Sequence, residues 1–335
     1  MSACPALTPA EAAMASWETK PSWPRSVFMS SRTLLAPAWA ASASAEPSST
    51  PAPASQAAPA ESGDAAEPAA AGAAGKKISI LTANLSSVTT NQMCEMMKAG
   101  MEKEGMEVTL VDTKGDFGQL ASRIEDSVSA KADAIVIVSC DPGQIAPQLQ
   151  TAFDAGVPVF GCDSGYMEGM MINATSDNYA MGQLITKYLF EDLMGGKGTV
   201  IALTHRPHPG VVKRCEAFDD MIKDYPDITL ITEQHVEVPG PIENSRKIME
   251  NLILSNSAKD SVTAVWCGWD EPAIGATQAL MDAGRDEVIV TGVDGNSQAV
   301  ELINEGSNLK ATVEQNFEGM SQICLLYTSD AADEL

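Results

Sequence analysis

Short runs of β-branched and apolar residues recur between Lys76 and Ile323, and a helical pattern fills the gap after most of them. Continuous apolar runs are typical of buried strands, whereas apolar positions three and four residues apart are typical of helices. Ten strands are predicted, at 78–83, 108–112, 134–139, 157–162, 171–174, 199–204, 229–235, 264–267, 288–293 and 311–315. Eight helices are predicted, at 92–104, 118–130, 145–155, 179–194, 210–224, 243–255, 271–283 and 298–305.

This alternation predicts an α/β fold in which helices cover parallel sheets. Ten strands are too many for one ordinary doubly wound sheet, so the pattern favours two Rossmann-like lobes of about five strands each. In such sheets ligands bind beyond the carboxyl ends of the strands, and the residues at those ends therefore carry the functional information.

The residues before the first strand have a different composition. Of the 36 residues in 40–75, 16 are alanine and 5 are proline, and none is lysine or arginine, which is typical of a disordered tether. Residues 1–39 show neither helical nor strand periodicity. Arg32, followed by Leu34 and a run of small residues, nevertheless resembles a degenerate export signal. We therefore expect an exported protein, periplasmic or tethered to the cell surface, with the lipobox of a lipoprotein missing from this sequence.

The last residues, 324–335, resemble a translated adapter from DNA library preparation. On this interpretation they are an artefact outside the fold, and the natural chain continues beyond Ile323 with other residues. The folded part would then end at 323.

Charge and cysteine content exclude several classes of protein. The chain has 45 acidic and 21 basic residues and a net charge of −24, which repels nucleic acid and anionic membranes. No apolar run reaches the roughly 18 residues of a membrane span. Seven cysteines without a CxxC pair predict neither a zinc site nor a disulfide framework. Cys140 and Cys162 lie at the ends of two strands expected to be neighbours, where they form either a disulfide or two reduced thiols. We expect no metal and no cofactor.

The predicted strand ends are rich in hydroxyl, amide and carboxylate groups. Ser87 lies in the segment after the first strand, Ser139 ends the third, Asp163 follows the fourth, and Asp294 follows the ninth. Such groups make paired hydrogen bonds with a polyhydroxylated molecule, and an aromatic face such as that of Trp269 covers its apolar C–H groups.

From Lys77 to Ile323 the chain resembles the type I periplasmic sugar-binding proteins, the ribose-binding-protein relatives that feed ABC importers. The resemblance rests on six marks in order: Pro158-Val159-Phe160-Gly161-Cys162-Asp163-Ser164, Ser176-Asp177-Asn178 with Gly182, Val212-Lys213-Arg214-Cys215-Glu216-Ala217-Phe218, Asp270-Glu271-Pro272-Ala273-Ile274-Gly275-Ala276, Gly292-Val293-Asp294-Gly295, and Ala311-Thr312-Val313-Glu314-Gln315.

The resemblance implies a monomer of two lobes, with residues 76–175 and 316–323 in the first and 176–315 in the second. It implies three chain crossings, the third beyond Ile323, and hinge closure around a monosaccharide, polyol or similar ligand. An ABC permease and its ATPase are the implied partners. The same family also supplies ligand receptors for chemotaxis, quorum sensing and two-component sensors, with nucleoside or autoinducer-like ligands, and the sequence leaves this alternative open.

Position by position, the resemblance makes Asp163, Arg214, Asp294 and Gln315 polar contacts of the ligand. The chain departs from ribose binders at Thr89 and Thr90, which replace two phenylalanines, at Ser164, which replaces an arginine, and at Trp269, which replaces an asparagine. Ribose itself is therefore not the expected ligand. We expect Trp269 to supply the stacking face and the space near Thr89 and Ser164 to admit a different or larger polyhydroxylated molecule.

Two other classes of protein are disfavoured. The effector domain of LacI-type transcription factors has the same fold as these binding proteins. Such a factor needs a basic helix-turn-helix before the first strand, where this chain has its cation-free tether. An enzyme is not expected, because the chain has no nucleophile elbow and no phosphate loop, and Gly195-Gly196-Lys197-Gly198 precedes a strand instead of following one.

Overall fold

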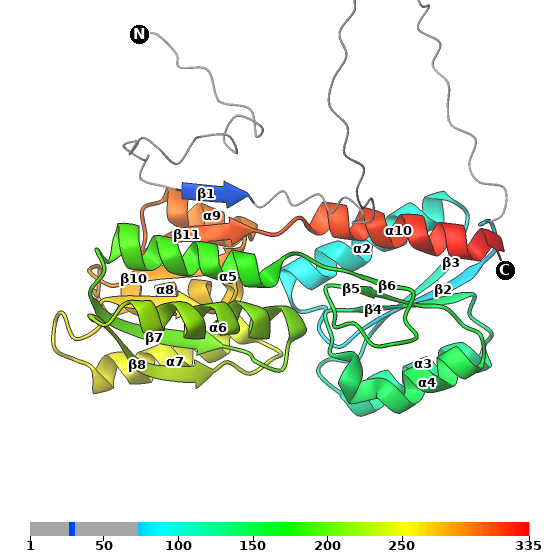
Figure 1. Cartoon of the computed structure of the whole chain (residues 1–335), viewed down its shortest axis with the longest axis horizontal. Coiled ribbons are helices and arrows are strands. Elements are labelled where there is room, and N and C mark those ends of the chain that lie inside the picture. Colours follow the sequence, from blue (N-terminus) through cyan, green and yellow to red (C-terminus); the bar gives the residue numbers. More distant parts are fainter. Residues whose placement is uncertain (1–26, 31–72, 335) are drawn as a thin grey trace, which may run out of the picture.

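The computed structural model describes residues 27–30 and 73–334, which form two lobes lying side by side (Figure 1). Lobe 1 has a parallel sheet in the order β3-β2-β4-β5-β6. Its strands are β2 (Lys77–Thr82), β3 (Glu107–Asp112), β4 (Ala134–Val138), β5 (Val159–Cys162) and β6 (Ile172–Ala174). Its helices are α2 (Val88–Lys103), α3 (Phe117–Ser129), η1 (Pro142–Ile145), α4 (Ala146–Asp154) and α10 (Phe317–Glu334).

Lobe 2 has a second parallel sheet, in the order β1-β11-β10-β9-β7-β8. Its strands are β1 (Val27–Ser30), β7 (Gly198–Thr204), β8 (Ile228–His235), β9 (Ala264–Cys267), β10 (Ile289–Asp294) and β11 (Leu309–Glu314). Its helical segments are α5 (Asn178–Lys187), η2 (Tyr188–Leu193), α6 (Pro209–Met221), η3 (Ile222–Asp224), α7 (Pro241–Ser255), α8 (Asp270–Asp282) and α9 (Ser297–Asn304). The predicted fold class is confirmed.

Strand β4 shows why the sheet of lobe 1 forms. All five of its residues are buried. Val136 belongs to the core beneath α2 and α10, whereas Ile135 and Ile137 belong to the core beneath α3 and α4. Successive side chains of a strand point to opposite faces, so a fully apolar strand requires helices on both faces and is typical of a parallel sheet.

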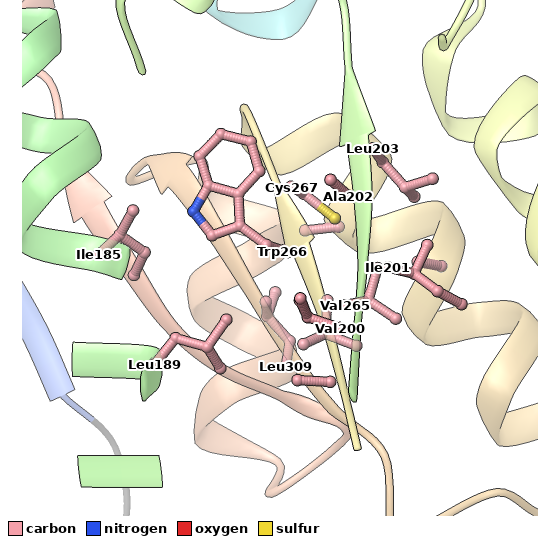
Figure 2. Packing of buried hydrophobic residues seen from close by; sticks show 14 of the residues in the cluster. Ile185, Leu189, Val200, Ile201, Ala202, Leu203, Val265, Trp266, Cys267 and Leu309 are labelled. Carbon is pink, nitrogen blue, oxygen red and sulfur yellow. The ribbon is translucent and has the colours of Figure 1, made fainter. Parts of the chain in front are cut away.

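The core of lobe 2 is built around Trp266, which is fully buried. Figure 2 shows its ring projecting from β9 toward Ile185 and Leu189. Its indole nitrogen donates a hydrogen bond of 3.0 Å to the hydroxyl of Thr186 in α5. The one polar atom of a large apolar side chain is thereby satisfied, and the indole fixes α5 against the sheet.

The prediction for the N-terminal residues was incomplete. Val27–Ser30 form a strand that pairs in parallel with β11, from Val27 opposite Ala311 to Ser30 opposite Glu314. Four residues carry no periodic signal of their own, because their pairing depends on the open edge of a strand almost 300 residues later. The expected export signal and most of the expected tether lie outside the described residues. Ala73, at the end of that tether, is already buried in lobe 1.

Residues 324–334 were expected outside the fold, whereas the structure has them in helix α10 of lobe 1; their origin as a translated adapter stays a prediction. Helix α10 continues to Glu334, and Cys324 and Thr328 are both fully buried. With Phe317 and Met320 they continue one stripe at helical spacing, which packs against lobe 1. The thiol of Cys324 also donates a hydrogen bond of 3.2 Å to the carbonyl of Gly161 in β5, which joins α10 to the sheet of lobe 1.

The chain crosses between the lobes twice within 73–334. One crossing joins β6 to α5 through residues 175–177, and the other joins β11 to α10 through Gln315 and Asn316. No helix in this part of the chain is both long and apolar enough to span a membrane. The six cysteines described here are free and buried, Cys140 and Cys162 included, so these two are thiols.

Candidate functional site

A cavity of about 170 Å³ lies between the two lobes. Both lobes contribute the segments that follow their strands, because the carboxyl ends of the two parallel sheets face each other there. Eight of the nine predicted site residues line it: Ser87, Thr89, Ser139, Asp163, Arg214, Trp269, Asp294 and Gln315.

The side chain of Arg214 is 2% exposed and is held from three directions. Its Nε donates to the Asn178 side chain at 2.8 Å, and its Nη1 donates to the Gly268 carbonyl at 2.9 Å and to Asp294 at 3.0 Å. Gln315 donates from Nε2 to the same oxygen of Asp294 at 2.9 Å. Within the described residues Nη2 has no hydrogen bond, so the guanidinium is oriented by one side and keeps two N–H donors for another molecule.

Close packing of α5 and α6 brings Arg214 to this position. A Cβ at Gly182 in α5 would lie 2.7 Å from the backbone of Arg214, closer than side-chain carbons approach backbone atoms. Glycine at this position allows the helices to meet and places Asn178 beside the guanidinium. The glycine of the predicted Ser-Asp-Asn motif therefore has a packing role.

Asp163 extends from the end of β5 in lobe 1 with a positive φ of 50° and is 6% exposed. Its hydrogen bond from the Thr175 hydroxyl is long, at 3.4 Å, and the Nε2 of His208 in lobe 2 lies 3.9 Å away. Burial raises the pKa of this carboxyl to about 7; Arg214 opposes the rise and Asp294 adds to it. A buried carboxyl with so few donors is a strong acceptor for a ligand.

Glu271 is a lining residue that the sequence interpretation missed. Its Oε2 accepts a 3.2 Å hydrogen bond from Trp269 Nε1, and its Oε1 accepts one of 3.3 Å from the backbone N–H of Val88 in lobe 1. Ser87, the N-cap of α2, makes no side-chain capping bond. A carboxylate of lobe 2 thus caps a helix of lobe 1, which the acidic first turn of α8 alone could not reveal.

The hydroxyls of lobe 1 lie at the N-terminus of α2. Ser87 and Thr89 share a hydrogen bond of 3.2 Å, and Thr90 donates to Ser139 at 3.1 Å. Each hydroxyl can rotate toward a ligand or toward its neighbour, so this wall of the cavity adapts to donors and acceptors alike.

Ser164, also predicted to contact the ligand, is not among the residues that line the cavity. Its hydroxyl donates to the Ile137 carbonyl at 3.1 Å and accepts from the Cys140 backbone N–H at 3.3 Å. The side chain amide of Asn173 donates to its carbonyl at 2.6 Å. Successive side chains diverge at the strand end, so the direction that points Asp163 into the cavity turns Ser164 back toward the sheet.

Two histidines, His205 and His208, also line the cavity. His208 caps α6, its Nδ1 accepting from the backbone N–H groups of Gly210 at 3.1 Å and Val211 at 3.3 Å. Burial lowers its pKa to about 3, with Arg214 adding to the effect. His205 stacks on His235 with ring centroids 4.9 Å apart. Within the described residues no group of three His, Cys, Asp or Glu side chains forms a metal site.

The chain matches a known protein family and several curated proteins. A family model described as a periplasmic binding protein domain matches residues 78–334. The chain is 29% identical over 255 residues to the ribose import binding protein RbsB of Bacillus subtilis, covering 74% of this chain and 79% of that one. It is 30% identical over 220 residues to a D-apiose import binding protein of Actinobacillus succinogenes, covering 65% and 69%.

Solved structures show the same arrangement. An ABC transporter solute binding protein from Agrobacterium vitis, solved with bound allitol, matches with a TM-score of 0.72 and 29% identity. The match covers 76% of this chain and 88% of that structure.

Proposed function

The chain belongs to the periplasmic binding protein family, and from this premise we propose that it is the substrate-binding component of a sugar-type ABC importer. Its ligand is a monosaccharide, a polyol or a similar polyhydroxylated molecule, and it acts by binding without catalysis. Members of this family are exported to the periplasm. A transmembrane permease with its ATPase is the partner that receives the ligand, and tethering at the cell surface is part of the same proposal.

The observation that carries the proposal is a cavity between the lobes whose walls bring together charged, hydroxyl and aromatic side chains from both lobes. Arg214 offers two N–H donors, and Asp163 and Asp294 offer carboxylate oxygens, an arrangement that suits adjacent hydroxyl groups. The ring of Trp269, 8% exposed, supplies an apolar wall for C–H groups. A cavity of about 170 Å³ favours a small ligand over a polymer.

Contacts between the lobes support hinge closure as the mode of binding. Val88 in lobe 1 bonds to Glu271 in lobe 2, and His208 in lobe 2 approaches Asp163 in lobe 1. These contacts exist only when the lobes are together, and a ligand that touches both walls adds to them. Such a ligand stabilises the closed form because it makes fewer contacts in the open one.

The test is a thermal-unfolding screen of the full chain with pentoses, hexoses, polyols and glycosides, followed by calorimetric titration of any compound that raises the melting temperature. A ligand that binds only the native state must raise it. We expect at least one neutral or substituted sugar or polyol to do so. If no compound of this class binds, the proposal is refuted.

Two arginine variants connect binding to the cavity. Arg214→Lys keeps the charge but loses the forked donor, so it should weaken binding of the identified ligand by at least about tenfold. Arg206→Lys is the matched control, because Arg206 pairs with Glu233 and Asp219 outside the cavity. Equal affinity in the wild type and the Arg214 variant would show that the ligand binds elsewhere.

A further inference from the structure

The cavity has an excess of negative groups. Asp141, Asp163, Glu271 and Asp294 line it, and among the described lining residues Arg214 is the only lysine or arginine. The guanidinium is already paired with Asp294 at 3.0 Å. The remaining carboxylates therefore have no cationic side chain among the lining residues to balance them.

Two buried acceptors of the cavity, on Gln315 and Asp163, have few or no hydrogen-bond donors. Gln315 is 4% exposed, and its Oε1 has no hydrogen bond within the described residues. Its amide orientation is set by the bond from Nε2 to Asp294, which requires the N–H end there and leaves the oxygen free. Asp163, from the other lobe, has only the long hydrogen bond from Thr175. The amide oxygen thus has no donor, and the carboxylate has one long hydrogen bond.

The histidines of the cavity do not supply the missing charge. The Nδ1 of His208 accepts two backbone hydrogen bonds, so its ring holds a proton on Nε2 alone and is neutral. His205 bonds to the Val236 carbonyl through Nδ1 at 3.0 Å, and its partly buried ring has a lowered pKa, first because of burial. A positive charge that matches the cavity must come with the ligand.

We propose that the preferred ligand is an amino-substituted sugar or polyol, whose ammonium group binds at Asp163 and Gln315 while its hydroxyl groups bind at Arg214. An ammonium brings three donors and one positive charge to a carboxylate with one long hydrogen bond and an amide oxygen with none. A neutral hydroxyl brings one donor and no charge, and so leaves the buried carboxylate uncompensated. The face of Trp269 is a further favourable surface for a cation.

This inference rests on the proposed function, because it names the chemical class of ligand for the same cavity. The net charge of −24 acts in the same direction at longer range, since it raises the local concentration of cations around the protein.

The test compares matched probes by calorimetric titration of the full chain at about pH 7.5, where Asp163, with a pKa of about 7, is ionised and an alkyl amine is protonated. The probes are D-glucose, D-glucosamine and N-acetyl-D-glucosamine, the galactose series, and D-sorbitol with 1-amino-1-deoxy-D-sorbitol. We expect at least one amine to bind about tenfold or more tightly than its hydroxyl parent and its N-acetyl form. If parents bind as well as or better than amines, the inference falls and the proposed function stands. If neither the amines nor the neutral panel binds, both fall.

Two variants locate the charge preference. In Asp163→Asn the amine and its hydroxyl parent should bind within about twofold of each other, because the carboxylate that distinguishes them is gone. Asp126→Asn is the control, since Asp126 pairs with Arg123 on the surface of α3 and does not line the cavity. An amine preference that survives unchanged in Asp163→Asn would overturn the assignment.

Discussion

Replacing Asp163 by asparagine should stabilise the protein without ligand at alkaline pH. Burial raises the pKa of this carboxyl to about 7, against 3.8 for an ordinary aspartate; Arg214 opposes the rise and Asp294 adds to it. The folded state holds the proton more tightly than the unfolded state. The contribution of the protonated carboxyl to the free energy of unfolding is therefore fully present below about pH 4. It is lost as the pH rises through about 7.

The magnitude follows from the two pKa values. Each tenfold difference in proton binding is worth about 1.4 kcal/mol, so the difference between 3.8 and about 7 corresponds to about 4 kcal/mol. Asparagine resembles the protonated carboxyl in shape and never ionises. The variant should therefore match the wild type near pH 4 and exceed it by up to about 4 kcal/mol at pH 8 and above.

The assay is urea unfolding of the full chain, monitored by circular dichroism, at several pH values from 4 to 8. Asp116→Asn is the control of opposite sign, because a hydrogen bond from the Gln119 backbone lowers the pKa of Asp116. The ionised carboxylate of Asp116 adds to the free energy of unfolding at neutral pH, and this contribution is lost as the pH falls. Its replacement should therefore not raise the free energy of unfolding at pH 8. A free-energy difference between Asp163→Asn and the wild type that stays constant from pH 5 to pH 8 would refute the reasoning.

Three further outcomes are expected. Glu271→Gln should weaken ligand binding about fivefold in calorimetry, because the cross-lobe bond to Val88 loses its charge; unchanged affinity would contradict this. Gly275→Ala should lower the free energy of unfolding by about 1–3 kcal/mol in urea, since its Cβ would clash with the Ile242 carbonyl. Arg214→Met should cost about 3–5 kcal/mol in the same assay at neutral pH, because it leaves a buried carboxylate unpaired, and a change below 1 kcal/mol would argue against that ion pair.

Much of the candidate site could be predicted from local pattern. Asp163 and Asp294 directly follow or end apolar strands, and Gln315 follows another. The carboxyl ends of parallel strands meet at one edge, so residues far apart in the sequence are brought together once the alternation of strands and helices is recognised. The position of Trp269 after β9 follows from the same rule.

Other parts of the site depend on pairings that no local pattern contains. Glu271 matters because it reaches Val88 in the opposite lobe, and His208 matters because its ring approaches Asp163. Ser164 has the residue type and the position of a site residue, yet its hydroxyl is used by the backbone of neighbouring strands. Side-chain direction beyond a strand end is set by the surrounding packing, which a sequence interpretation cannot evaluate.

The sequence by itself determined the α/β class, the ten strands between Lys76 and Ile323 and the side chains available at their ends, because periodicity is a local property of the chain. Only the tertiary structure decided that β1 pairs with β11 and that α10 continues through Cys324. It also decided which polar groups remain without partners. That outcome depends on how two separately folded sheets approach each other, and their approach creates both the cavity and its unbalanced charge.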